Sequence, residues 1–134
     1  MPERIELNPP WPWASKFRIA QGVQVGNRVY VSGQVAFDPQ GNVVGRDNMG
    51  AQASQVFENI RAVLAEAGAT MDDVVKITAF ITDMSRYTDY TAARAKAFPN
   101  NIPASATVAT PTLVSPDLLV EVDAVAEIGS GKRA

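Results

Sequence analysis

The chain offers carboxylates, cations, hydroxyls and amides for chemistry. Its 134 residues contain 0 His and 0 Cys, which excludes Ser-His-Asp triads, histidine general bases, thiolate nucleophiles and metal sites built from these side chains. A magnesium or calcium site built from carboxylates alone is possible in principle, but no segment has the Asp-rich loop spacing that would support it. We therefore expect either an enzyme that needs no cofactor and no metal, or a module that only binds a ligand.

The clearest candidate for acid–base chemistry lies in the segment 118–128. Apolar residues alternate there with Glu121, Asp123 and Glu127, which is the period of a strand with one buried face. From this alternation alone, Glu121 belongs to the polar face of a strand. Ser105 has neither a histidine nor a nearby lysine to activate it, so packing or backbone bonding is a better interpretation than a nucleophilic role.

Charge and hydropathy restrict the partners. The 12 Lys and Arg and 14 Asp and Glu residues give a net charge of −2, so neither nucleic acid nor a membrane is an expected partner. Prolines interrupt the longest uncharged run, between Lys96 and Asp117, and it is not a membrane span. The first residues lack the pattern of a signal sequence. We expect a cytoplasmic protein in which residues 1–134 form a single domain.

Residue patterns along the chain predict the elements that must position these groups. A hairpin is expected over 19–34, with its turn at Gly26-Asn27, and a second turn over 38–42. Apolar residues at steps of three and four predict a helix over 49–67, begun by Asp47 or Asn48 and closed by Gly68. Further elements are a strand over 74–82, a helix from 85 to about 98, and strands over 106–109 and 118–128.

The predicted order is β-β-β-α-β-α-β-β, an α+β arrangement. Right-handed crossovers would place both helices on one face of the sheet. The strand over 74–82 is apolar on both sides, so the uncovered face would expose a large apolar patch. We therefore expect a homo-oligomer whose pockets lie between subunits. The Pro-rich segment 8–13 carries Trp11 and Trp13, which either pack it onto the body or cover a ligand.

These segments together resemble the Rid family, the reactive-intermediate deaminases also called the YjgF family. The resemblance rests on the order and spacing of VYVSGQ (29–34), QASQVFENI (52–60), AGAT (67–70), VVKIT (74–78), Pro103-Ala104 and VEVDAVA (120–126). It implies a chorismate-mutase-like fold, a mixed β-sheet with two helices packed on one face, a homotrimer with clefts between subunits, and no cofactor. Members hydrolyse imines or enamines shed by pyridoxal-phosphate enzymes.

The chain departs from this family at the acid-binding end of the site. In those deaminases an Arg directly after the Pro-Ala pair clamps the substrate carboxylate, and here Ser105 stands in its place. Losing such a charge-assisted contact costs about 1.5–3 kcal/mol. A family aromatic residue corresponds to Ile19, although Phe17 could fill its space, and a family Asn corresponds to Thr91. Arg94 is either a solvated helix charge or a substitute anion clamp.

The resemblance assigns the family's water-positioning carboxylate to Glu121, which would act as a general base. Desolvation between subunits would raise its pKa. The backbone around Ser32 and Gly33 and the amides near Ala106 and Thr107 would hold a small-molecule substrate. Two further side chains, Gln34 and Gln52, either orient the ligand or bond the backbone, and Tyr87, Tyr90 and Phe98 are expected in the core or at an interface.

The sequence therefore predicts a cofactor-free hydrolase of the Rid type that adds water to a reactive imine, enamine or similar electrophile. Because of Ser105, a standard 2-imino acid deaminase is not expected. The alternative is a non-catalytic trimer that binds a small ligand or has a regulatory role. A third activity attached to relatives, ribonuclease or translation inhibition, is disfavoured by the net charge of −2 and by the 0 His residues.

Overall fold

The computed structural model describes residues 3–132. Its strands are β1 (Arg4–Leu7), β2 (Gly22–Val25), β3 (Arg28–Gln34), β4 (Val74–Ile81), β5 (Ala104–Ala109) and β6 (Val120–Glu127). Its α-helices are α1 (Met49–Ala65) and α2 (Tyr87–Ala97), and short 3₁₀ turns occur at η1 (Ala14–Phe17), η2 (Met71–Asp73) and η3 (Met84–Arg86). Among the described residues, no helix is both long and apolar enough to cross a bilayer.

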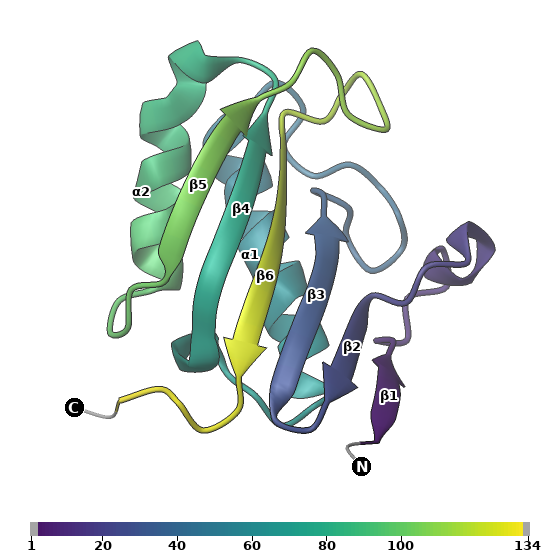
Figure 1. Ribbon diagram of the computed structural model, residues 1–134. Helices are drawn as coiled ribbons and strands as arrows, with labels where there is room; N and C mark the ends of the chain where they lie inside the picture. Colours follow the sequence, from purple (N-terminus) through teal and green to yellow (C-terminus); the bar gives the residue numbers. More distant parts are fainter. Residues whose placement is uncertain (1–2, 133–134) are drawn as a thin grey trace.

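The strands form one mixed sheet in the order β1-β2-β3-β6-β4-β5. Neighbouring strands are antiparallel except for β4 and β5, which run parallel and are joined through α2. Both helices pack on the same face of the sheet, as Figure 1 shows. The predicted α+β fold, with a mixed sheet and two helices on one face, is confirmed.

Helix α1 forms where the apolar period predicts it. The Asn48 side chain accepts a hydrogen bond from the backbone N–H of Ala51 and caps the first turn. Gly68, with φ of 72°, ends the helical segment in a left-handed conformation that favours glycine. The buried stripe faces the sheet and supplies much of the core; its members are Met49, Gln52, Ala53, Val56, Phe57, Asn59, Ile60, Val63 and Leu64.

The first three strands differ from the expectation. The Gly26-Asn27 hairpin forms as predicted, but the additional strand lies before it, as β1, because Arg4–Leu7 pairs with β2 at the edge of the sheet. The segment Arg-Ile-Glu-Leu does alternate polar and apolar residues, but over only four residues, which is the shortest run that indicates a strand. After the turn over 38–42, a single bridge joins Phe37 and Val43 where a third strand was expected.

The face of the sheet opposite the helices carries apolar side chains in contact with water. Tyr30 on β3 is 46% exposed and Val108 on β5 is 45% exposed. The half-buried Phe80 lies between them on β4. This is the face toward the viewer in Figure 1. A second protein surface that covered it would remove these side chains from water.

Candidate functional site

Glu121 lies on the open face of the sheet and leans over Gly33 of the neighbouring strand β3. A Cβ added to Gly33 would stand 2.8 Å from Cδ of the Glu121 carboxylate, closer than real atoms approach. The carboxylate therefore occupies the space that any other residue at this position would need. Among residues 3–132, no ion pair includes Glu121.

A bulge in β3 produces this approach. Val31 pairs with Ala124 and Gln34 pairs with Val122, so two residues of β3, Ser32 and Gly33, stand opposite one residue of β6. Such a bulge re-aims the backbone locally and increases its twist. The Ser32 hydroxyl donates a hydrogen bond of 2.6 Å to the carbonyl of Ala20, and so ties the bulge to the preceding loop.

Three buried glutamines hold the strands around Glu121. Gln34 donates from Nε2 to Oε1 of Gln21 at 3.0 Å. Gln52 of α1 accepts at Oε1 from the backbone N–H of Leu119 and donates to the carbonyl of Asp117, each at 2.8 Å. The bonds from Gln52 fix the entry into β6, just before Glu121. Gln52 thus bonds the backbone. Gln34 bonds Gln21 and also donates to the backbone carbonyl of Ser32 at 3.2 Å, and it lines the Glu121 cavity.

A cavity of about 170 Å³ adjoins the Glu121 carboxylate. Its walls come from the N-terminal loop, from the end of β3, from the segment after it and from the loop before β6. The lining residues are Trp13, Phe17, Ile19, Gln21, Ser32, Gly33, Gln34, Val35, Phe37, Val114 and Glu121. The structure therefore brings the candidates Ile19, Ser32 and Gly33 together with Glu121.

The surroundings raise the pKa of Glu121 above its ordinary value. Desolvation by burial is the larger cause, and the negative charge of Asp123, the next residue on the same face of β6, is the smaller one. Both penalise the ionised form. A carboxylate with a raised pKa is a stronger base once ionised, which suits proton transfer near neutral pH.

Aromatic rings form much of the cavity wall. Trp13 stacks on Trp11 with ring centroids 5.7 Å apart and meets Phe37 edge to face at 5.2 Å. The wall beside Phe37 is fixed from behind by Asn59 of α1, which donates from Nδ2 to the carbonyls of Val35 and Phe37 at 3.0 and 2.9 Å. The segment 8–13 thus packs on the body and also borders the cavity.

The other candidates lie around a second cavity, between α2 and β5. Arg94, Ser105 and Thr107 line it together with Met84 and Tyr87, and its volume is about 490 Å³. The Arg94 guanidinium lies 5.4 Å from the centre of the Tyr90 ring. No ion pair among residues 3–132 includes Arg94, so its charge is available to a ligand.

The two cavities open on opposite faces of the same sheet. Ser105 and Thr107 stand in register with Ile77 and Ala79 of β4, whose side chains are buried beneath the helices. Glu121 is in register with Phe80, which points to the other face. Within one protomer, the Glu121 cavity and the Arg94 cavity therefore cannot act on the same small molecule.

Two candidates line neither cavity. Ala106 alternates with Ser105 and Thr107 and lies on the open face of β5, in register with Thr78. The Thr91 hydroxyl donates to the carbonyl of Thr88 one turn earlier in α2. Of the aromatic residues expected in the core or at an interface, Tyr90 and Phe98 are buried, whereas Tyr87 is exposed beside Arg94.

Sequence reasoning missed part of the Glu121 cavity. Gln21, Val35, Phe37 and Val114 line it, and none of them was a candidate. Their positions along the chain share no spacing, because they come from separate loops that meet only in the folded protein. Among residues 3–132, no three His, Cys, Asp or Glu side chains come close enough together to hold a metal ion.

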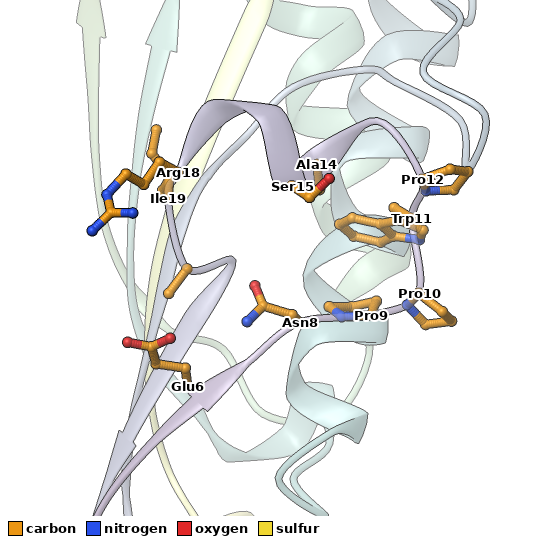
Figure 2. A pocket seen from close by; sticks show the side chains of 11 residues that line it. Glu6, Asn8, Pro9, Pro10, Trp11, Pro12, Ala14, Ser15, Arg18 and Ile19 are labelled. Atoms are coloured by element: carbon orange, nitrogen blue, oxygen red, sulfur yellow. The ribbon is translucent and has the colours of Figure 1, made fainter.

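A larger cavity, of about 720 Å³, lies within the N-terminal loop. In Figure 2 the loop curls so that Asn8, Trp11 and Ser15 surround it. Ile19 is the only sequence-predicted site residue that lines it, and Ile19 also lines the Glu121 cavity. The smaller cavity is the better candidate site because a desolvated carboxylate lies beside it.

The sequence of the chain is similar to those of known proteins. The family model described as Endoribonuclease L-PSP matches residues 14–128. A RutC family protein of Pyrococcus abyssi is 34% identical over 80% of this chain and 84% of its own. The mitochondrial protein MMF1 of Saccharomyces cerevisiae is 33% identical over 92% of this chain and 83% of its own.

Solved structures agree as well. A protein of the Rid family, YyfA from Yersinia pestis, superposes with a TM-score of 0.87 at 30% identity, covering 94% of this chain and 100% of that one. RidA from an Antarctic Psychrobacter superposes with a TM-score of 0.84 at 34% identity, covering 92% and 99%. From its sequence match and its fold, the chain belongs to the endoribonuclease L-PSP family, also called the Rid or YjgF family.

Proposed function

We propose that the protein is a cofactor-free hydrolase that adds water to a reactive imine, enamine or similar electrophile, with Glu121 as the general base. The observation that carries the proposal is the Glu121 carboxylate itself. It is partly desolvated, engaged in no ion pair among residues 3–132, and aimed into a cavity over a glycine. Such a group can hold a water molecule and accept its proton.

The proposed reaction on an imine has two stages. As the water oxygen bonds to the electrophilic carbon, its proton moves to Glu121 and the electron pair of the C=N bond moves to nitrogen, which takes up a proton from solvent; the hydroxyl proton lost in the second stage returns it. The resulting aminol then loses ammonia as the C–N bond breaks and its hydroxyl proton is released, which leaves a carbonyl compound. The proton on Glu121 is available to the departing nitrogen, so the carboxylate ends ionised.

The complete site is proposed to lie between subunits of a homotrimer. The open face of the sheet carries Tyr30, Val108 and the Glu121 cavity, and a neighbouring copy that covered this face would desolvate the carboxylate further. The Arg94 cavity opens on the other face, so it could meet the Glu121 cavity only across a boundary between two copies. Sedimentation equilibrium at micromolar protein tests the assembly, and a monomer would contradict it.

The proposed substrate depends less on a carboxylate clamp than the substrates of Arg-containing deaminases. Ser105 offers a hydroxyl in place of a guanidinium, and Arg94 of α2 lines the same cavity. The ribonuclease activity that the family name suggests is not part of the proposal, because the chain has 0 His and a net charge of −2. The proposed compartment is the cytoplasm. Because the yeast relative is named as a mitochondrial protein, cell fractionation is the test of this proposal.

The test is a competition for a freshly made imine. An amino-acid oxidase generates iminopropanoate from alanine in the presence of semicarbazide, and the protein is added as wild type, as Ser105→Arg and as Glu121→Gln. We expect the wild type to lower semicarbazone formation slightly, Ser105→Arg to lower it strongly, and Glu121→Gln to have no effect.

The alternative function, a non-catalytic ligand-binding trimer, has a different outcome in the same assay. Neither the wild type nor Ser105→Arg would then compete with semicarbazide, and Glu121→Gln would have no turnover to lose. That result would replace the hydrolase proposal with the binding module.

A further inference from the structure

The cavity beside Glu121 has a wall that water addition by itself does not require. Six of its lining residues are apolar and three of these are aromatic: Trp13, Phe17, Ile19, Val35, Phe37 and Val114. We infer that this wall selects the substrate, and that the group on its electrophilic carbon is uncharged, apolar and about the size of one ring or a branched alkyl chain. The inference rests on the proposed hydrolase function and specifies its substrate class.

The volume of the cavity fits a single ring. It measures about 170 Å³, and an apolar protein cavity of about 150 Å³ is large enough to bind benzene. The methyl group of iminopropanoate would leave most of this space to water or vacant, and would make few contacts with the rings. A phenyl or isobutyl group would fill it and exchange contact with water for contact with the wall.

Charge excludes an acidic group from this end of the site. Among residues 3–132, no Lys or Arg side chain lines the cavity. Its titratable residue is Glu121, and Asp123 adds a second negative charge on the same face of β6. A carboxylate placed here would meet two like charges and no compensating cation. A substrate carboxylate, where one exists, must therefore point away from the aromatic wall.

The wall has a fixed part and an exposed part. Trp13 is held by its stack on Trp11 and by its edge contact with Phe37. Phe17 also meets the Trp13 ring edge to face, at 5.9 Å, but it is 45% exposed, and Val114 is 71% exposed. These two side chains form an apolar rim that a bound ring would help to remove from water, and they can be truncated without opening the core.

The first experiment compares two imines with the same carboxylate and different side chains. An L-amino-acid oxidase generates the imine of phenylalanine or of alanine, and hydrolysis is measured against the semicarbazide trap. Full burial of a phenyl-sized group predicts that kcat/KM for the phenylalanine imine exceeds that for the alanine imine by about 10- to 100-fold. Equal values would overturn the inference and leave the proposed function standing.

Variants of the rim locate the origin of the preference. Phe17→Ala and Val114→Ala each should reduce the phenylalanine-to-alanine ratio of kcat/KM by about 3- to 10-fold, because each removes part of the wall. Ile102→Ala is the matched control, since Ile102 is an apolar residue 88% exposed that does not line the cavity. An unchanged ratio in both rim variants, or an equal fall in the control, would overturn the inference.

A binding measurement keeps the two proposals separable when no imine is hydrolysed. The 2 tryptophans of the chain, Trp11 and Trp13, stack at the wall, so their fluorescence reports on its occupancy. Phenylacetamide should quench it and acetamide should not, and Phe17→Ala should weaken phenylacetamide binding at least threefold. This result without hydrolysis would reject the hydrolase and retain the ligand class; no difference between the two amides would reject the ligand class.

Discussion

The carboxylate of Glu121 lies where a side chain on Gly33 would lie. A Cβ on Gly33 would stand 2.8 Å from Cδ of Glu121 and 3.1 Å from its Cγ. The glycine therefore serves close approach between two strands. Glu121 owes its direction into the cavity to a residue that lines the cavity with backbone atoms alone and so leaves room for the carboxylate.

Gly33→Ala should abolish most hydrolysis with little effect on the fold. The added methyl group must displace the Glu121 side chain, whose far end can rotate away, so the core is not disturbed. We expect kcat to fall at least tenfold, while the Tm changes by less than about 4 °C, the equivalent of about 1 kcal/mol. Gly50→Ala is a control on α1, because a Cβ there would meet its nearest neighbour at an ordinary 3.7 Å.

The pH dependence of activity should report the raised pKa of Glu121. A general base must be ionised, so kcat/KM should rise with pH through a pKa above the ordinary value for Glu, and this acid limb should disappear in any residual activity of Glu121→Gln. A limb at or below the ordinary value would contradict a desolvated base.

The same pKa predicts an unusual effect on stability. Because the folded-state pKa of Glu121 is raised, the folded protein binds more protons than the unfolded chain between the two pKa values, and the free energy of unfolding falls as pH rises through that window. The Glu121→Gln side chain cannot ionise, so the variant does not undergo this fall in the free energy of unfolding. The variant should therefore have a higher Tm than the wild type at pH 7–8, with the difference shrinking toward pH 4. Thermal unfolding at several pH values measures this, and a variant less stable at pH 7 would contradict it.

Arg94→Ala should weaken binding of carboxylate ligands by about 10-fold or more, as expected when a charge-assisted hydrogen bond is lost. Calorimetric titration with phenylpyruvate measures the affinity. Lys96→Ala is the matched control, because Lys96 is an exposed cation on the same helix that does not line the Arg94 cavity. Unchanged affinity in Arg94→Ala would show that Arg94 is a solvated helix charge.

Asn59→Ala should destabilise the protein and loosen the cavity wall. Asn59 is 4% exposed, and its amide satisfies two carbonyls of the segment that carries Val35 and Phe37. Leaving buried carbonyls without this donor should cost about 1–3 kcal/mol in the free energy of unfolding. Urea denaturation measures it. Gln55→Ala, which removes only the contact from Gln55 to Asn59, should cost less, and equal losses would contradict the assignment.

Tyr90→Phe should leave stability unchanged or raise it by up to about 1 kcal/mol. The Tyr90 ring is fully buried against Phe57, and its hydroxyl forms no hydrogen bond of ordinary geometry among residues 3–132. A buried hydroxyl without a partner is a cost that Phe removes. Tyr87→Phe, at an exposed position, is the neutral control. A loss above 1 kcal/mol in Tyr90→Phe would mean that the hydroxyl is bonded in the assembled protein.

The elements with strong local patterns could be predicted from the sequence by itself. The apolar period of 49–67, the β-branched run of 74–82 and the Gly26-Asn27 turn each match an element of the structure. Such patterns indicate which side chains face the core, and they can be identified within one short segment of the chain. Edge strand β1 was not predicted because it is short and buries only one of its four side chains. The third strand, expected after the turn over 38–42, is a single bridge between Phe37 and Val43.

The sequence also determined the available chemistry. A chain with 0 His and 0 Cys has neither an imidazole nor a thiolate to act as a base, and the alternation over 118–128 placed the carboxylate of Glu121 on a two-faced strand. Only the tertiary structure decided which residues join it. The bulge that brings Gly33 beneath the carboxylate depends on pairing between β3 and β6, which are distant in sequence. The separation of Ser105 and Arg94 from Glu121 depends on which face of the sheet each occupies, because the helices cover one face and leave the other open.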